Sequence, residues 1–581
     1  MKKTALLFLA CCWATFTHAQ YYQAKLNEDQ TLDIDRMEGT LPIAGPRDNF
    51  DQLPGFPKGT LANPTFKNLR NVTLADLTGN GIEEILFAAG NKLFAYSADT
   101  LLWEKTLSGT AIYPPSVADV DNNGTLDLVQ TTGGIPAAGR IYLLDANGND
   151  FTGWPLNFSN NWILSAATLS DLNDDQQMEI IVGERVSPAG RVHILQLDGT
   201  SFNDSWPITL DKTPAVTPSV GDIDNDGEKD IVIYSSESRY IFNLDGTTKA
   251  GFPIHTDPNQ RYSYQSPLLV DFDGNQQYEI VGSTHGDAPQ FYVLNSDGSF
   301  HNGWPIDVPG ASWTYSPPTV VEIDGDYRIF MSRPISTTPG PMLFNWDAEG
   351  NLQSGFPITK AGGLEGLISV ADVDNDDAFE LIFGANIIDT AGYGFIHAYE
   401  LDGVTEVDGF PIRPRGWTFL NGANLGDVNN DGSLDLVALT YTSTFGAGTD
   451  STYLHAYDLG VPYDPEKILW RTYKGSNTRT GLVGEQVLSS TKATPVKALN
   501  LRIFPNPAGE HLQLLLQSED QITVDIVLYN HAGQVVQAFL QQEIEPGTHQ
   551  RQISLNNLPA GLYWINVKGQ EHLLSHKFVK H

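Results

Sequence analysis

Short apolar segments separated by polar turns dominate the chain, and the same order of segments recurs about every 50 residues. Each unit contains an acidic turn, a β-branched run such as residues 180–182, and an alternating segment such as residues 140–144. A turn such as Leu-Asp-Gly at residues 244–246 ends the alternating segment. The pattern predicts about four short strands per unit, which is the size of one blade of a β-propeller.

Two motifs mark the units. The first is an acidic turn, Asp-x-Asp/Asn-x-Asp/Asn-x-x-x-Asp/Glu, followed by apolar β residues; its first positions are Asp76, Asp119, Asp171, Asp222, Asp271, Glu322, Asp372 and Asp427. The second is a Gly-Phe/Trp-Pro tag, in which Ser205 once replaces glycine; its aromatic residues are Phe56, Trp154, Trp206, Phe252, Trp304, Phe356 and Phe410. Eight acidic turns at this spacing indicate a repeat architecture.

The repeats predict an all-β chain with an eight-bladed β-propeller, and a seven-bladed ring is the alternative. A single blade leaves both faces uncovered, whereas neighbours in a closed ring cover each other and leave no exposed sheet edge. An open β-solenoid or a sandwich is disfavoured, because the repeat is long for a solenoid turn. The aromatic tags number nine when Trp103 and Trp470 are included, one more than the acidic turns, which predicts that residues 50–66 add a strand to the last blade and close the ring.

The acidic turns are candidate calcium sites. Side-chain oxygens at positions 1, 3, 5 and 9, with a backbone carbonyl at position 7, can surround a hard cation that takes about six to eight oxygens. Glycine at position 6, as in Gly227, permits the sharp turn. The predicted side-chain ligands are Asp76, Thr78, Asn80 and Glu84 in repeat one; Asp119, Asp121, Asn123 and Asp127 in repeat two; Asp171, Asn173, Asp175 and Glu179 in repeat three; Asp222, Asp224, Asp226 and Asp230 in repeat four; Asp271, Asp273, Asn275 and Glu279 in repeat five; Asp372, Asp374, Asp376 and Glu380 in repeat seven; and Asp427, Asn429, Asp431 and Asp435 in repeat eight.

Repeat six departs from this pattern, since Phe330 stands at position 9, and we expect its site to be empty or weak. An EF-hand is excluded, because position 12 is Gln130 in repeat two and Ile233 in repeat four instead of glutamate. A plain polar turn would explain one copy, but seven copies with acids in register would repel strongly without a cation. We therefore expect about seven Ca²⁺ sites.

Residues 67 to about 485 resemble the FG-GAP/VCBS repeat family of integrin-α-type propellers. The acidic turns, the Gly-Phe/Trp-Pro tags and the final stretch from Trp470 to Gly481 carry this resemblance. The resemblance implies a ring that binds calcium in its turns and binds partners through loops at the ends of its blades. The propeller is accordingly assigned to residues 50–485.

A second β domain is expected at residues 500–581, after a Ser/Thr/Lys-containing linker at residues 486–499. Its predicted strands, at residues 501–504, 512–517, 522–529, 534–540, 550–555 and 561–567, fit a small Ig-like β-sandwich. Phe-Pro-Asn-Pro at 504–507, Leu-Pro-Ala-Gly at 558–561 and Lys-Phe-Val-Lys at 577–580 resemble the type A sorting domain of the type IX secretion system. The resemblance implies a Bacteroidota-type Gram-negative cell, the type IX machinery as partner, and a secreted or outer-surface location. An ordinary Ig-like binding module is the alternative.

The first 19 residues have the pattern of a secretory signal peptide, with two lysines, an apolar run over residues 5–16 and Ala19 before the expected cleavage point. Cys11 and Cys12 lie in this segment, so the mature chain is expected to have no disulfide; lipidation of Cys11 is the alternative. Residues 20–49 form an N-terminal extension. No other apolar run approaches the about 20 residues of a membrane-spanning helix.

Charge and motifs narrow the function. The net charge of -36 argues against nucleic acid and against an anionic membrane as partners. The sequence has none of the common catalytic motifs, such as Gly-x-Ser-x-Gly or His-Glu-x-x-His. We expect a non-catalytic binding or adhesion module for an extracellular glycan or protein. A lyase-type polysaccharide-active enzyme on the same scaffold and a passive surface-layer component are the alternatives.

Large aromatic residues recur shortly before the acidic turns, in loops that enter the blades: Tyr113, Trp162, Tyr262, Tyr264, Trp313, Tyr315 and Trp417. Aromatic faces at the rim of a ring could stack on sugars, so Trp162, Trp313 and Trp417 are candidate ligand-binding residues. Packing between blades is the favoured alternative for these positions.

Overall fold

The computed structural model describes residues 19–26, 32–39, 50–63, 67–133, 139–158, 162–163, 165–186, 188–262, 264–308, 316–333, 339–442, 450–484, 500–504, 508–518, 522–530, 535–544, 547–556, 558–568 and 573–581. These residues are all β apart from one short 3₁₀ helix, η1 (Pro465–Lys467). None of the described segments forms an apolar helix of membrane-spanning length. The predicted signal peptide lies outside the described residues, except for Ala19.

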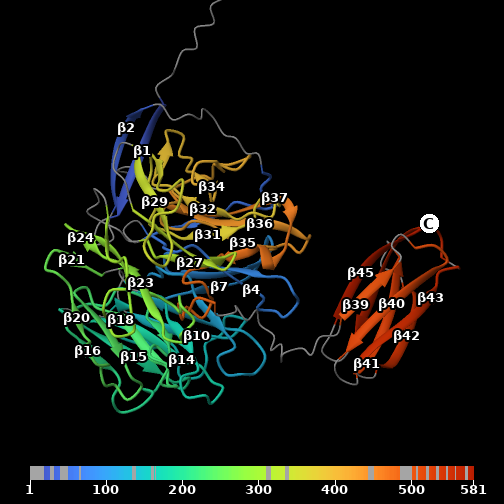
Figure 1. The fold of residues 1–581 in the computed structure, drawn as a ribbon, viewed down its shortest axis with the longest axis horizontal. Helices are drawn as coiled ribbons and strands as arrows, with labels where there is room; N and C mark the ends of the chain where they lie inside the picture. Colours follow the sequence, from blue (N-terminus) through green and yellow to red (C-terminus); the bar gives the residue numbers. More distant parts are fainter. Residues whose placement is uncertain are drawn as a thin grey trace, which may run out of the picture. The chain divides into compact units, whose positions relative to one another are not determined.

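A series of small antiparallel sheets follows the chain (Figure 1). Each sheet is the blade of the repeat whose acidic turn it contains. Blades one to four consist of β4 (Thr73–Ala75), β5 (Glu84–Ala89), β6 (Lys92–Ser97) and β7 (Thr100–Thr106); β8 (Ser116–Ala118), β9 (Asp127–Thr132), β10 (Arg140–Leu144) and β11 (Leu156–Asn157); β12 (Trp162–Ile163), β13 (Thr168–Ser170), β14 (Glu179–Val186), β15 (Ala189–Leu195) and β16 (Ile208–Leu210); and β17 (Ser219–Gly221), β18 (Asp230–Tyr234), β19 (Ser238–Phe242) and β20 (Ile254–His255).

The later blades have the same organisation. They consist of β22 (Leu268–Val270), β23 (Glu279–Ser283), β25 (Gln290–Leu294) and β26 (Ile306–Asp307); β27 (Thr319–Ile323), β28 (Asp326–Ser332), β29 (Gly340–Trp346) and β30 (Ile358–Lys360); β31 (Ile368–Ala371), β32 (Glu380–Gly384), β34 (Ile396–Glu400) and β38 (Ile468–Trp470); and β35 (Asn424–Gly426), β36 (Ser433–Tyr441), β37 (Ser451–Pro462) and β3 (Lys58–Leu61). A separate pair joins β21 (Gln260–Arg261) and β24 (His285–Gly286). Successive blades pack face to face; one apolar cluster joins Ile181, Val232 and Leu269 of blades three, four and five. The predicted all-β propeller fold is confirmed.

The last blade takes its outer strand from the beginning of the chain. β3 pairs antiparallel with β37 along its whole length. Gly55 of the early tag lies against blade one, since a Cβ on Gly55 would come within 2.9 Å of the Asp99 Cβ. The prediction that this region supplies a strand to the last blade is confirmed by residues 58–61, and it explains why the first tag precedes the first acidic turn.

Side-chain hydrogen bonds join the innermost strands of neighbouring blades. Thr73 Oγ1 donates to Pro115 O at 2.7 Å. Bonds of the same kind run from Ser116 to Ala167, from Thr168 to Pro218, from Ser219 to Pro267, from Thr319 to Ile368 and from Ser369 to Ala423. Asn424 Nδ2 donates to Val72 O at 3.0 Å, and this bond connects the last blade back to the first.

Residues 470–483, here called the hub segment, run past the innermost strands. Their carbonyls accept hydrogen bonds from inner-strand amides of blades two to five, which pair Asn477 with Val117, Thr478 with Leu169, Thr480 with Val220 and Gly481 with Leu269. β38, whose last residue Trp470 begins the segment, pairs with β31 of blade seven. Arg479 is fully buried and donates to Thr73 Oγ1 of blade one at 2.7 Å. The hub segment therefore connects most of the blades at the centre of the ring.

The Gly-Phe/Trp-Pro tags lie where neighbouring blades meet. Each tag's aromatic–proline peptide bond is cis. Trp154 Nε1 donates to Leu197 O of the next blade at 2.8 Å, and Trp304 makes the equivalent bond to Ala348 O. Glycine is required at Gly355, where φ is +83° and a Cβ would lie 1.6 Å from the Asp402 carbonyl oxygen of the next blade. The tags thus set the spacing between blades.

The N-terminal extension forms a hairpin on the ring. β1 (Ala19–Leu26) pairs with β2 (Leu32–Gly39) and with β33 (Ile387–Asp389). β33 lies in the connection between β32 and β34 of blade seven. Ala24 joins an apolar cluster with Tyr113, Trp417 and Tyr473, which come from two blades and the hub segment. The hairpin therefore covers aromatic residues at the centre of the ring.

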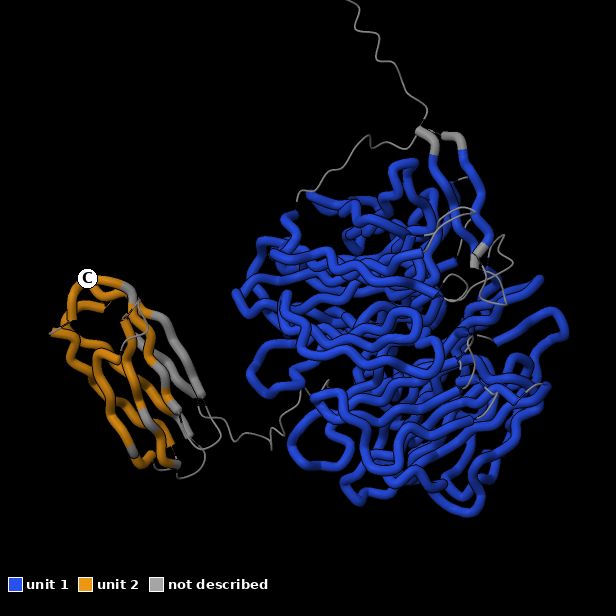
Figure 2. Tube along the Cα trace, turned by 180° about the vertical axis from the view of Figure 1, so that it is seen from behind, with its two compact units in different colours: residues 1–491 blue, residues 492–581 orange. Residues whose placement is uncertain are grey.

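The chain divides into two compact units, residues 1–491 and residues 492–581 (Figure 2). In the second unit one sheet has β39 (Asn500–Phe504), β40 (His511–Ser518) and β43 (Gly547–Ser554), and the other has β42 (Val535–Ile544), β41 (Ile522–Asn530), β44 (Gly561–Lys568) and β45 (Leu573–Lys580). Leu514, Ile526 and Ile565 share its core. Sequence analysis did not predict β45, because polar residues at 575–577 interrupt its apolar pattern.

Candidate metal centres

The acidic turn folds in the same way from repeat to repeat. In repeat two, Asp119 at position 1 accepts hydrogen bonds from the backbone amides of Asn123 and Gly124, both at 2.9 Å. Asp127 at position 9 accepts from the amide of Val120 at 3.2 Å. These bonds close the turn into a loop and orient its acidic side chains toward one centre.

The position-5 side chains also hold the loop. Each accepts a hydrogen bond from the amide two residues later, at 2.6 to 2.9 Å, in Asn80, Asn123, Asp175, Asp226, Asn275, Asp376 and Asp431. A carboxylate or amide oxygen has a second lone pair, so this bond leaves it able to ligate a cation. The predicted positions 1, 5 and 9 therefore belong to one preorganised loop.

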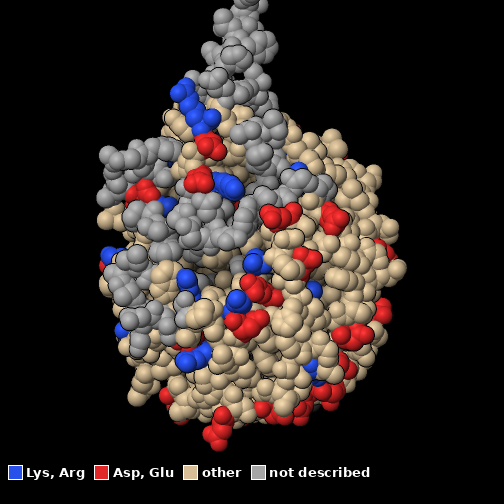
Figure 3. All heavy atoms as spheres, turned by 90° about the vertical axis from the view of Figure 1, so that its left-hand side faces the viewer, with Lys and Arg blue, Asp and Glu red and all other residues tan. Residues whose placement is uncertain are grey.

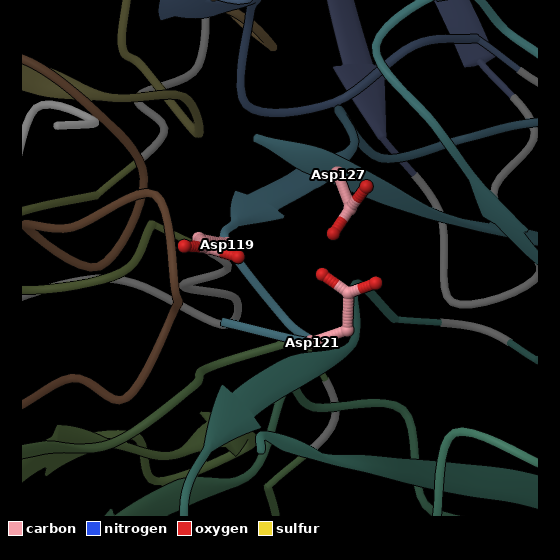
Figure 4. A group of neighbouring side chains, drawn as sticks. All are labelled: Asp119, Asp121 and Asp127. Atoms are coloured by element: carbon pink, nitrogen blue, oxygen red, sulfur yellow. The ribbon is translucent and has the colours of Figure 1, made fainter. Parts of the chain in front are cut away.

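The carboxylates of three repeats meet closely. In repeat two, oxygens of Asp119, Asp121 and Asp127 all lie within 4.8 Å of one another. Figure 4 shows the carboxylates of Asp121 and Asp127 pointing toward each other, with Asp119 beside them. The same convergence occurs for Asp222, Asp224 and Asp230 in repeat four and for Asp372, Asp374 and Glu380 in repeat seven. Within the described residues, three predicted carboxylate ligands meet this closely only in repeats two, four and seven.

Burial sets the electrostatics of these loops. Burial raises the pKa of Asp127 to about 7, and the nearby carboxylates of Asp121 and Asp119 act in the same direction. Burial likewise raises the pKa of Glu380 to about 8. Buried oxygens of Asp121, Glu380 and Asp435 have no hydrogen-bond partner among the described residues. Unpaired buried carboxylate oxygens are costly, and a divalent cation with oxygen ligands would both pair and neutralise them.

Repeats three, five and eight form the same loop, but among the described residues their carboxylates do not meet as closely as those of repeats two, four and seven. Glu179, Glu279 and Asp435 accept from the position-2 amides at 2.8, 3.1 and 3.0 Å. Their position-1 acids, Asp171, Asp271 and Asp427, each accept from the position-6 amide at 2.9 Å. At position 3, Asn173 and Asn429 donate to the position-5 carboxylates, and Asp273 accepts from the Asn275 amide. Repeat one has Asp76 and Glu84 in the same roles, with Thr78 Oγ1 3.4 Å from Glu84 Oε1.

One acid near repeat seven was not among the residues predicted from the sequence. Oxygens of Asp374, Asp376 and Glu400 lie within 4.8 Å of one another. Glu400 ends β34, and its backbone is directly opposite Glu380 in the sheet. The available signal was its place immediately before the Leu-Asp-Gly turn at residues 401–403.

A lysine at repeat four was not predicted from the sequence either. The Nζ of Lys249 lies 2.6 Å from Asp224 Oδ1, 3.0 Å from Asp226 Oδ2 and 3.1 Å from Asp230 Oδ2. Burial raises the pKa of Asp230 to about 6, and the lysine opposes this rise. Lys249 is 23 residues after Asp226 in the sequence, so the local motif gives no sign of it.

Repeat six has a hairpin in place of the loop. Ile323 pairs with Asp326 across a two-residue turn, in which Asp324 and Gly325 have φ values of 56° and 83°. Phe330 at position 9 is fully buried. The tight turn provides no loop around a cation, in line with the missing acid.

The candidate stacking residues differ in exposure. Trp417 is fully buried beside Phe419. Burial of this kind is expected if the residue packs between blades and does not contact a sugar. Trp162 is half-buried, and the Arg185 guanidinium lies 5.0 Å from the centre of its ring. Trp313 lies outside the described residues.

Two parts of the chain match known families. Residues 171–233, which span the acidic turns of repeats three and four, match the FG-GAP-like repeat. Residues 502–581 match the secretion system C-terminal sorting domain. The chain carries FG-GAP-like repeats and ends in a type IX sorting domain. This domain directs the protein to the secretion machinery and to the outside or outer surface of the cell.

Similar solved structures are distant. The structure of BBS1N in complex with ARL6DN is 12% identical, with a TM-score of 0.34, and the match covers 69% of this chain and 95% of that one. The V. cholerae biofilm matrix protein Bap1 is 12% identical, with a TM-score of 0.30, and the match covers 96% of this chain and 90% of that one. PorZ of Porphyromonas gingivalis is 12% identical, with a TM-score of 0.27, and the match covers 86% of this chain and 74% of that one. No curated protein matches the chain. At these values the similarities support no inference about function.

Proposed function

We propose that the protein is an exported propeller that binds calcium in its acidic turns and acts as a non-catalytic binding or adhesion module for an extracellular glycan or protein. The sorting domain supports the extracellular location. Calcium stiffens the loops between the first two strands of the blades. The rigid ring then presents loops from many blades to a partner.

The observation that carries the calcium proposal is the convergence of three carboxylates, with a buried acid at position 9, in each of repeats two, four and seven. Oxygen-only ligands in a loop closed by its own amides suit a hard divalent cation. The buried oxygens of Asp121 and Glu380 that have no hydrogen-bond partner among the described residues support a cation in repeats two and seven. Carboxylates this close would otherwise stay partly protonated near neutral pH.

Calorimetric titration and thermal melting with and without EDTA test this part. We expect several Ca²⁺ ions per chain and a lower melting temperature in EDTA, because an ion bound only by the folded state stabilises it. Asp127→Asn should bind about one ion fewer. At calcium 100-fold above the dissociation constant, this variant should lose up to about 3 kcal/mol of calcium-dependent stability.

Asp204→Asn is the control, since Asp204 is an exposed acid outside the acidic turns. It should leave the number of ions and the melting temperature in calcium unchanged. Equal melting of the wild-type chain in calcium and in EDTA, with no heat of binding, would contradict the calcium proposal.

A screen of the purified mature chain against glycans and matrix proteins, in calcium, tests the binding part. We expect a retained partner and no ultraviolet absorbance from unsaturated sugar products. Release of such products from pectic or host glycans would instead support the lyase alternative. Absence of both binding and turnover would favour a passive surface component.

A further inference from the structure

Repeat four, like repeat seven, has a carboxylate at all four predicted side-chain positions, yet its centre contains a lysine. The Lys249 ammonium lies within 3.1 Å of carboxylate oxygens at positions 3, 5 and 9 of the turn. Only 12% of the lysine side chain is exposed. An ammonium has three donors and a full positive charge, so it satisfies three carboxylates at once.

The backbone of the blade holds this lysine in place. Lys249 N donates to Ile241 O of β19 at 2.9 Å, and the residue stands two positions before the glycine of the tag. In blades two, five, six and seven the backbone amide at the corresponding position also donates to a carbonyl of the preceding strand. The residues at these positions are Phe151, His301, Gln353 and Val407. Among these blades, only blade four places a lysine over its own acidic turn.

We propose that the Lys249 ammonium is a tethered cation that competes with calcium for repeat four. Repeat four then binds calcium more weakly than repeats two and seven, although its sequence has more acids than that of repeat two. This inference rests on the proposed calcium binding. A charge tethered to the same blade acts at a high effective concentration, and calcium must displace it before the carboxylates can bind the ion.

A second lysine provides a comparison. The Nζ of Lys467 lies 2.7 Å from Asp372 Oδ2, 3.1 Å from Asn375 Oδ1 and 2.7 Å from Asp377 Oδ1 in repeat seven. Only Asp372, at position 1, is a predicted ligand among these partners, so Lys467 occupies one ligand of repeat seven, whereas Lys249 occupies three ligands of repeat four. Removal of Lys467 should therefore change calcium binding less than removal of Lys249.

The test is calorimetric titration of the full mature chain with Ca²⁺ after removal of bound metal. Lys249→Met and Lys249→Gln should each bind one ion more than wild type, or bind the weakest ion about tenfold more tightly. Lys467→Met should show a smaller gain than either Lys249 variant. Adding Asp230→Asn to Lys249→Met should abolish the gain, since the new site would lose its position-9 ligand.

Thermal melting gives a second readout for the same variants. In EDTA, Lys249→Met should melt below wild type, because three carboxylates lose their counter-charge. In saturating calcium this difference should vanish or reverse. Lys92→Met, which removes an exposed ion pair with Glu104 at 2.8 Å, should show no such dependence on calcium.

The outcomes separate the two proposals. If wild type and both Lys249 variants bind the same number of ions with the same affinities, the lysine proposal is overturned and the calcium proposal stands. If no form binds calcium, the proposed function fails and the competition fails with it. An equal effect of Lys249→Met on melting in EDTA and in calcium also overturns the competition.

Discussion

At the residue scale, the centre of the ring holds a carboxylate without a direct partner. Glu365 is 1% exposed, and neither carboxylate oxygen has a hydrogen-bond partner among the described residues. Burial raises its pKa to about 8, although the nearby charges of Arg70 and Lys25 oppose the rise. The Arg70 guanidinium donates instead to the backbone carbonyls of Glu365 and Tyr264. A pKa of about 8 favours the protonated form of Glu365 at pH 7.

Replacement of Glu365 by glutamine should change the pH dependence of stability. An unfolded glutamate ionises near pH 4.3. Because the folded pKa is higher, folding is penalised increasingly as pH rises from about 4 to 8, and the full penalty is present above pH 8. Glu365→Gln should therefore be closest to wild type near pH 4, and its advantage over wild type should grow by about 4 kcal/mol between pH 5 and pH 9.

Urea unfolding from pH 5 to pH 9, in a fixed excess of calcium, measures this difference. Asp307→Gln changes an exposed acid and serves as the control. Parallel stability curves for wild type and Glu365→Gln across this range would contradict the assignment of a neutral buried Glu365.

At the element scale, the hub segment forms hydrogen bonds through Arg479 both within itself and to the junction of blades one and two. The Arg479 guanidinium donates to Thr472 Oγ1 at 2.7 Å, to Tyr473 O at 2.7 Å and to Pro115 O at 3.2 Å. These bonds connect the hub segment to itself and to the junction between blades one and two. A buried guanidinium that satisfies several carbonyls fixes the segment at the centre of the ring.

Arg479→Met should lower the free energy of unfolding by about 3 kcal/mol, because it removes the buried hydrogen bonds of the guanidinium and leaves the Tyr473 carbonyl without this donor. Chemical denaturation in saturating calcium measures the loss. Arg191→Met is the matched control, since the Arg191 side chain is 45% exposed and lies 3.7 Å from Glu184. Equal stability of the two variants would show that the hub segment does not hold the ring together.

At the scale of the whole molecule, much of the negative charge lies in the acidic turns. The acidic turns hold many of the chain's 70 acidic residues. Figure 3 shows acidic side chains spread over the face in view, with a run along its lower right edge. Calcium in the turns would offset part of the net charge of -36 and the self-repulsion that it causes. The sorting unit keeps a separate apolar core, so the propeller's core does not depend on it.

Local spacing predicted much of this protein. The acidic turns and tags stand within single repeats, so their periodicity alone indicated the blades, and the one tag in excess of the acidic turns indicated the closing strand. The loops at Asp119 and Asp222 close through amides only a few residues away, and that is why sequence placed their ligands. The terminal motifs marked the sorting domain for the same reason.

Contacts between distant residues were decided only by the tertiary structure. Lys249 enters repeat four and Glu400 approaches repeat seven because strand pairing folds later residues back over the turn. Arg479 meets Thr73 only after the ring has closed. Trp417 is buried because it joins an aromatic cluster from several blades, which its neighbours in sequence do not reveal. The sequence of one repeat determines its own acidic turn and strands. The charged and aromatic side chains that reach this turn from distant parts of the chain depend on strand pairing and on the packing of the blades.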